Sequence, residues 1–183
     1  MDKNKTNLRL VIALAMLSAI SIITGKYLAI RGGDIMRFSL ENMPIIFAGM
    51  AFGPLAGALV GSVADLVGCL MVGYTINPLV TLGATVIGII SGALPVFLKK
   101  AKTNSWLITL ITVASAHLVG SLLIKTLGLS VYYDMPFYLL LLWRLLNYAI
   151  VGIIDGFAVH ILLNHKGIRM QINAMRGEKN DLR

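Results

Sequence analysis

The chain has 183 residues, of which 57% are hydrophobic and only 13% are charged, and its mean hydropathy is +0.83. A soluble domain carries roughly 25% charged residues, so this composition excludes an ordinary water-soluble protein and predicts an integral membrane protein. The net charge of +8 does not indicate nucleic-acid binding, because the basic residues cluster beside the apolar runs. The single cysteine, Cys69, excludes an intramolecular disulfide.

Apolar runs long enough to cross a bilayer, about 20 residues, recur along the whole chain. The first run follows a basic N-terminus and is too long for a signal peptide, so we interpret it as a transmembrane helix. The segment AFGPLAG interrupts the second run, because glycine and proline together break a helix. The sequence predicts an all-α membrane bundle in one domain, residues 1–183. The six expected transmembrane helices lie at about 10–30, 43–52, 55–73, 79–98, 106–126 and 137–164, and a basic tail follows at 165–183.

The distribution of basic residues sets the expected orientation of this bundle. If both termini are cytoplasmic, 11 of the 16 lysines and arginines lie on the cytoplasmic side. The reverse topology would place the same residues outside, against the usual bias of membrane proteins. We therefore expect cytoplasmic N- and C-termini and outer loops at 31–42, 73–78 and 127–136. The second helix is the weak point, since about ten residues do not cross a bilayer unaided.

Small residues recur every fourth position in three of the expected helices. Two of these rows are Gly53, Gly57, Gly61 and Ala84, Gly88, Gly92. Small side chains at this spacing let helix backbones approach closely in lipid, so we expect both rows to pack inside the bundle. The first helix carries a similar pair, Ala15 and Ala19, which either packs inside the bundle or forms a docking face for a partner membrane protein.

Three ionisable residues fall at membrane depth, namely Asp65, Arg144 and Asp155. Each costs roughly 2.5–3.5 kcal/mol to insert and is expected to face a partner or a cavity. Arg144 lies in the segment WRLLNY, one turn from Asn147. It either forms an ion pair with Asp65 or binds a ligand, with Asn147 and Arg144 together recognising an amide edge. For the two aspartates we favour a structural or gating role.

Further polar residues gather at the expected outer end of the bundle. The candidate ligand-binding residues there are Lys26, Arg31, Arg37, Tyr74, Asn77, Lys125 and Tyr133. The two lysines lie near the ends of spans, where they either extend to the membrane surface or meet an anionic ligand. The tyrosines either belong to the interfacial aromatic belt or stack on a flat ligand. No nucleotide-binding P-loop, His/Cys metal cluster or serine-nucleophile motif is present, so neither an enzyme nor a metal site is expected.

The segment RFSLENMPIIFAGMAFGPLAGALVGSVADLVGCL follows a basic N-terminus and a first helix with small residues. Together these features resemble the substrate-binding S components of energy-coupling factor (ECF) vitamin transporters. AFGPLAGALVG and VADLVG carry this resemblance, which covers essentially the whole chain. RFSLEN and WRLLNY narrow it to the folate-specific S component.

This resemblance implies a subunit that binds a vitamin from the outside and carries no enzymatic activity of its own. It implies docking through Ala15 and Ala19 onto a transmembrane coupling subunit that two ATPase subunits drive, with the S component toppling in the membrane. ATP is then used by the partners, and this chain needs no cofactor. For folate, Asn147 or an acidic residue would meet the pterin. The candidates for the folate carboxylates are Lys26, Arg31, Arg37, Lys125 and Arg144.

Two other functions fit the same residues. One is an S component for another vitamin, such as riboflavin, since S components share a fold while their ligand pockets differ. The other is a stand-alone proton-coupled carrier that uses Asp65 and Asp155 as a relay.

Overall fold

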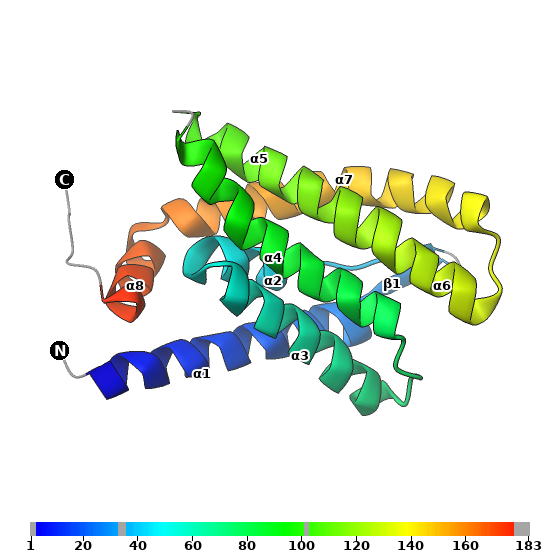
Figure 1. The fold of residues 1–183 in the computed structure, drawn as a ribbon, viewed down its shortest axis with the longest axis horizontal. Coiled ribbons are helices and arrows are strands. Elements are labelled where there is room, and N and C mark those ends of the chain that lie inside the picture. The colour runs from blue at the N-terminus through cyan, green and yellow to red at the C-terminus, as the bar shows by residue number, and fades with distance from the viewer. Residues whose placement is uncertain (1–2, 33–35, 101–102, 178–183) are drawn as a thin grey trace.

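The computed structural model describes residues 3–32, 36–100 and 103–177, and nearly all of them are helical (Figure 1). Two segments, labelled η1 and η2, are π-helical continuations of the helices before them. The helical elements are α1 (Lys3–Ile22), η1 (Ile23–Tyr27), α2 (Asn42–Phe52), α3 (Pro54–Val72), α4 (Pro78–Lys100), α5 (Ser105–Ala116), η2 (His117–Lys125), α6 (Thr126–Tyr133), α7 (Phe137–Asn164) and α8 (Lys166–Arg176).

Within the described residues, five helices are long and apolar enough to cross a membrane. They are Asn7–Tyr27, Pro54–Val72, Pro78–Leu98, Ser105–Tyr133 and Phe137–Asn164. The expected span at 43–52 corresponds to α2, whose 11 residues reach about 16 Å, roughly half of the hydrocarbon thickness. Eight of those residues are buried. The short helix is therefore the core around which the longer helices pack.

The chain turns between α2 and α3 inside the AFGPLAG segment. Gly53 adopts a φ of 98°, a region that only glycine enters readily, and Pro54 begins α3 with its φ already suited to a helix. The two residues together end one helix and start the next without a connecting loop. This turn allows α3 to run back toward the end of the bundle from which α2 came (Figure 1).

The helix that begins at Ser105 is longer than the sequence indicates. The expected loop at 127–136 is wrong for most of its length, because α6 continues to Tyr133. Gly128 does not end the helix, since it packs tightly on α4: an added Cβ would lie 2.8 Å from Leu79 Cβ. Asn77 Nδ2 also donates to the Gly128 carbonyl at 2.8 Å. Tertiary contact thus stabilises a helix in a segment of turn-like composition.

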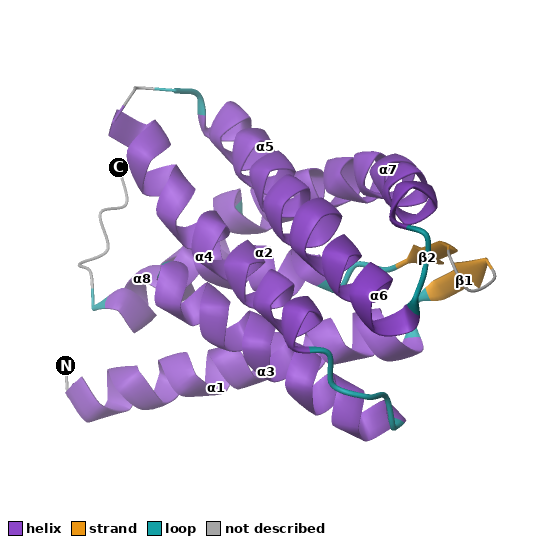
Figure 2. Ribbon diagram, turned by 45° about the vertical axis from the view of Figure 1, so that its right-hand side comes forward, coloured by secondary structure: helices purple, strands orange, loops and turns teal. Residues whose placement is uncertain are grey.

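The expected outer loop at 31–42 contains a short hairpin, an addition to the all-α expectation. Strand β1 (Ile30–Gly32) pairs antiparallel with β2 (Met36–Phe38), and Arg31 lies opposite Arg37. The hairpin lies beyond the ends of α1 and α6 (Figure 2). We call this the hairpin end of the molecule. The opposite end, the terminal end, holds the start of α1, the connection between α4 and α5, and α8 (Figure 1).

The predicted packing role of the glycine rows is confirmed for the contact between α3 and α4. A Cβ added at Gly57 would lie 2.5 Å from the carbonyl oxygen of Gly88. Gly61 lies in the same way against the backbone of Ala84, and Gly92 against that of Pro54. The two backbones therefore touch directly, as small residues permit in lipid.

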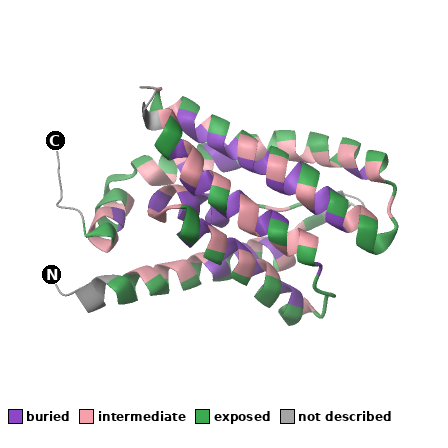
Figure 3. Cartoon of the chain, viewed as in Figure 1, coloured by how far each residue is buried: buried purple, intermediate pink, exposed green. Residues whose placement is uncertain are grey.

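Two helices leave most of their surface outside this core. Only 22% of the apolar window of α1 and 11% of that of α7 are buried. Figure 3 shows exposed residues along both helices. Large aliphatic side chains dominate these surfaces, as expected where a helix faces lipid or a partner helix rather than water.

We predict that Gly88→Ala destabilises the protein by about 1–3 kcal/mol, the usual cost of overpacking. The added Cβ would collide with the backbone of Gly57, which cannot move aside as a flexible side chain would. Thermal unfolding of the purified protein in detergent measures the effect. Gly152→Ala is the matched control, because the nearest atom to its Cβ is His117 Cδ2 at 3.6 Å, an ordinary contact. Equal losses in both variants would contradict the prediction.

Candidate ligand-binding site

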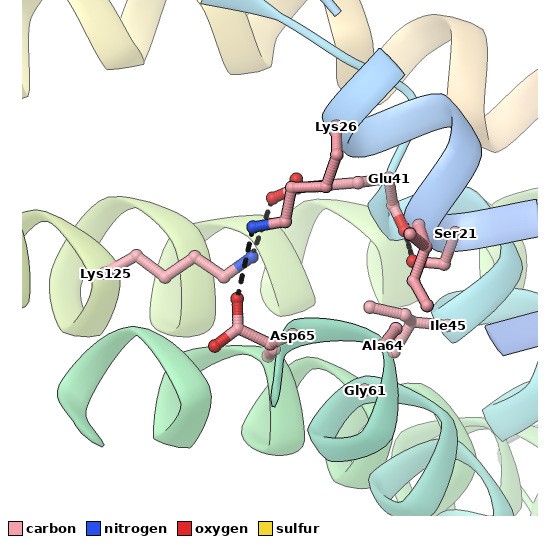
Figure 4. Close-up of a pocket in the computed structure, with 10 residues that line it drawn as sticks. Ser21, Lys26, Glu41, Ile45, Gly61, Ala64, Asp65 and Lys125 are labelled. Atoms are coloured by element: carbon pink, nitrogen blue, oxygen red, sulfur yellow. Dashed lines mark hydrogen bonds and ion pairs between the residues drawn. The ribbon is translucent and has the colours of Figure 1, made fainter. Parts of the chain in front are cut away.

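Two lysines near the hairpin end point into the bundle. The side chains of Lys26 and Lys125 are only 8% and 5% exposed. The interpretation that they extend to the membrane surface is therefore wrong. Each instead meets a carboxylate: Lys125 Nζ lies 3.0 Å from Glu41 Oε1, and Lys26 Nζ lies 3.9 Å from Asp65 Oδ1 (Figure 4). Both lysines lie in π-helical segments, which often occur at functional sites.

Glu41 holds the centre of this cluster. Besides Lys125, its carboxylate accepts a hydrogen bond of 3.0 Å from Arg37 Nη2. Its main-chain oxygen accepts a bond of 2.6 Å from Ser21 Oγ. Burial raises the pKa of Glu41, but the attraction of Lys125, Arg37 and Lys26 outweighs burial and holds the pKa well below its usual range. Glu41 is therefore fully ionised at neutral pH.

Asp65 is the second acid of the cluster and comes from α3. Thr81 Oγ1, on the neighbouring α4, donates to Asp65 Oδ2 at 2.6 Å. Lys26 Nζ also reaches Cys69 Sγ at 3.5 Å, one turn further along α3. With Arg37 and Lys125, the cluster holds three cations against two carboxylates. The cluster therefore retains an excess of positive charge inside a largely apolar bundle.

A small cavity lies within the cluster. Its volume is about 10 Å³, room for roughly one water molecule, and its polar walls are Ser21, Lys26, Glu41, Asp65 and Lys125 (Figure 4). A vitamin-sized ring does not fit into this space. Any such ligand must displace the lysine and carboxylate side chains that now occupy the centre.

Arg144 contacts no acidic side chain among the residues that the structure describes. Its Nη2 atom donates to the Ser121 carbonyl at 3.0 Å and to the Tyr148 hydroxyl at 3.2 Å. The guanidinium lies over the ring of Tyr148, 5.3 Å from its centroid. The interpretation of Arg144 as the ion-pair partner of Asp65 is therefore wrong. Its Nε atom is buried and has no hydrogen-bond partner among the described residues.

Asn147, one turn further along α7, ties that helix to the hairpin. Its Nδ2 atom donates to the main-chain oxygen of Arg37 at 2.6 Å, while the guanidinium of Arg37 donates to the carbonyl of Gly25 and to Glu41. The Asn147 Oδ1 atom is buried and lacks a partner within the described part of the chain. An unused donor on Arg144 and an unused acceptor on Asn147 thus lie one turn apart, the pair that an amide edge requires.

Sequence reasoning missed a chain of buried polar residues that leads away from the cluster. Lys125 Nζ donates to Asn42 Oδ1 at 3.3 Å, and Asn42 Nδ2 donates to Ser121 Oγ at 3.3 Å. His117 Nδ1 lies 3.4 Å from Ser121 Oγ, and His117 Nε2 lies 3.0 Å from Asp155 Oδ2. The signal was available, since Asn42, Ser121 and His117 are polar residues within apolar helices. No group of metal-ligating side chains occurs in the described ranges.

The remaining predicted site residues take different positions. Asn77 is buried; its Oδ1 accepts from the Leu79 backbone at 3.0 Å and so caps α4, while its Nδ2 is used by the bond to Gly128. Tyr74 lies beside the cluster, with Lys26 Nζ 5.8 Å from its ring centroid. Tyr133 is half exposed at the end of α6 and joins none of these contacts. Arg31 lies in β1, and its side chain is outside the described residues.

The small residues of α1 face outward. Ala15 and Ala19 are both exposed, whereas Ser18 between them is buried and donates to the Leu14 carbonyl at 3.0 Å. Exposure argues against packing within this chain as the reason for the alanine pair.

The sequence and the fold were compared with those of known proteins. Residues 9–163 match the family model described as "ECF transporter, substrate-specific component". Among solved structures, FolT bound with folic acid aligns with a TM-score of 0.67 and 22% identity, over 83% of this chain and 90% of that one. An S component for biotin aligns with a TM-score of 0.66 and 21% identity, over 94% and 99%.

A further S component of a bacterial ECF transporter aligns with a TM-score of 0.55 and 19% identity, covering 92% of this chain and 96% of its own. No curated protein matches the sequence. At these identities the structures share the fold, while the family match covers most of the chain. The chain therefore belongs to the substrate-specific (S) components of ECF transporters, multi-pass membrane subunits that bind a small molecule for uptake.

Proposed function

We propose that this S component binds folate. The observation that carries the proposal is the cluster of the buried Lys26 and Lys125 with the partly exposed Arg37, whose three positive charges exceed the two negative charges of Glu41 and Asp65. Folate brings carboxylates that match such an excess, whereas riboflavin carries none. The alignment with FolT, a protein solved with folic acid, supports the same ligand.

The site offers different groups to the two ends of a folate molecule. Lys125 and Lys26 would exchange Glu41 and Asp65 for carboxylates of the ligand, so that no lysine is left buried without a counter-charge. The unused Nε of Arg144 and Oδ1 of Asn147 would meet the amide edge of the pterin. The exchange also enlarges the small cavity, because the displaced side chains are those that fill it.

We also propose that the hairpin end faces outward and that the terminal end, with both chain termini, lies in the cytoplasm. The basic residues of the N-terminus, the α4–α5 connection and α8 support this orientation. Docking on the transmembrane coupling subunit would use the exposed Ala15 and Ala19 face of α1. ATP would be hydrolysed by two partner ATPase subunits, and this chain would hold no cofactor.

Biotin is the second candidate ligand, because an S component for biotin aligns over nearly the whole of both chains. It carries one carboxylate and a cyclic urea, whose amide edge Arg144 and Asn147 could also meet. The number of cations in the cluster favours the ligand with more negative charge.

We expect the purified protein to bind folate, and a large excess of biotin or riboflavin to leave that binding unchanged. Arg144→Ala should weaken folate binding about tenfold or more, since a charge-assisted hydrogen bond contributes about 1.5–3 kcal/mol. Competition binding with labelled folate measures both effects. Arg9→Ala, which removes an exposed arginine near the start of α1, is the control. Displacement of folate by biotin at equal concentration would contradict the proposal.

A second prediction separates the structural and ligand-binding roles of Lys125. Lys125→Met leaves Glu41 without its main counter-charge, so we expect a stability loss of about 3 kcal/mol and weak folate binding. The double variant Lys125→Met/Glu41→Gln removes the uncompensated charge. It should recover most of the thermal stability but not the affinity for folate. A double variant with wild-type affinity would exclude Lys125 from the ligand site.

A third prediction concerns docking. Ala19→Leu adds bulk to the exposed small-residue face of α1 and should reduce folate uptake by cells about tenfold, while folate binding by the purified protein stays unchanged. The matched control is Ala149→Leu, the same change at an exposed position of α7. If both variants transport folate at the wild-type rate, the face of α1 is not the docking surface.

A further inference from the structure

A polar groove of about 720 Å³ lies at the terminal end, away from the ligand cluster. It lies where the start of α5, the last turn of α7 and α8 meet, over the ends of α2 and α4. Its hydrogen-bonding side chains include Ser105, Thr109, Asn164, Arg169, Asn173 and Arg176. The lining is thus unlike the apolar surfaces elsewhere on this membrane protein.

The described lining of the groove is basic. Two guanidinium groups line it, and no carboxylate is found among its lining residues. The guanidinium of Arg169 forms no hydrogen bond or ion pair with any residue that the structure describes. The acids of the described segments lie elsewhere: Asp155 is bonded to His117, Glu41 and Asp65 belong to the ligand cluster, and Asp134 follows α6 at the hairpin end. Among the described residues, nothing therefore neutralises the charge of Arg169, the group on which the site depends.

The position of α8 places the groove at the level of the membrane surface. The helix follows the long transmembrane helix α7 after a turn at His165 and packs back on the bundle through Ile168 and the buried Ile172. Its three basic residues, Lys166, Arg169 and Arg176, are exposed. An amphipathic helix with this division lies in the membrane interface, where the phosphates of lipid headgroups are found.

From these observations we propose that the groove between α5, α7 and α8 is a binding site for a phosphate group. Arginine donates parallel hydrogen bonds that fit phosphate oxygens, and the hydroxyl and amide side chains opposite it supply further donors. Basic pockets between helices at the membrane surface bind anionic lipid headgroups in this way. The phosphate belongs either to such a headgroup or to a soluble phosphate ester. The proposal does not depend on which vitamin the hairpin end binds.

The test uses the full-length protein, delipidated in a neutral detergent. Native mass spectrometry measures binding of phosphatidylglycerol, phosphatidylcholine and glycerol phosphate separately. We expect phosphatidylglycerol to bind at least tenfold more tightly than phosphatidylcholine. If glycerol phosphate binds and displaces the lipid, the site recognises the phosphate group alone. If only the lipid binds, the site recognises the phosphate as part of a lipid headgroup. Either result supports the site.

Substitutions locate the binding to the groove. Arg169→Gln should weaken phosphatidylglycerol binding about tenfold, the loss of one charge-assisted hydrogen bond. Arg169→Lys keeps the positive charge but loses the planar guanidinium, so its affinity for phosphatidylglycerol should lie between those of Arg169→Gln and the wild type. This second variant keeps the test valid if Arg169→Gln folds poorly. Lys166→Gln is the matched control, because Lys166 lies on the same helix and is exposed, but does not line the groove.

Two outcomes would overturn the proposal. One is equal binding of phosphatidylglycerol and phosphatidylcholine. The other is the same loss of affinity in Lys166→Gln and Arg169→Gln, which would mean that the lipid responds to the overall charge of α8 and not to a site.

Discussion

The need to neutralise positive charge inside a lipid-embedded bundle governs the arrangement of the hairpin end. Lys125 and Lys26 are buried, and each would be prohibitively costly there without a carboxylate within reach. Glu41 supplies one counter-charge from the start of α2, and Asp65 supplies the other from α3. These pairs fix where η1, η2, α2 and α3 lie relative to one another. They also form a site in which a negatively charged ligand can replace the internal partners of the lysines.

The packing of α2, α3 and α4 against one another relies mainly on contacts that contain no charge. Backbone touches backbone where Gly57 meets Gly88, and α2, too short to span a bilayer, is buried at the centre. This division leaves α1 and α7 with mostly exposed apolar surfaces. The bundle thus combines a glycine-packed interior with an exterior of exposed apolar side chains.

The sequence predicted correctly those elements that depend only on residues close together in the chain. The break at Gly53 follows from the conformation that glycine and proline allow, and the small residues of α3 and α4 were correctly expected to pack inside the bundle. The helix through Gly128 could not be predicted, because its stability comes from contact with Leu79 and Asn77, about fifty residues earlier in the chain.

The partners of the charged side chains at the site could not be predicted from the sequence either. The composition identified the ionisable residues but left their partners open: Lys125 was expected either to extend to the membrane surface or to meet an anionic ligand, and Arg144 either to pair with Asp65 or to bind a ligand. Partner choice depends on how far each helix is rotated, and the π-helical turns of η1 and η2 alter that rotation without a recognisable sequence signal.

The position of Arg37 has a mechanical consequence. Its main-chain oxygen is bound by Asn147 of α7, while its side chain is bound to Gly25 of η1 and to Glu41. One residue thus joins β2 to α7 through its backbone and to η1 and the Glu41 carboxylate through its side chain. Any displacement of β2 from α7 is therefore expected to disturb the counter-charge of Lys125 as well, because Glu41 is bonded to both Arg37 and Lys125.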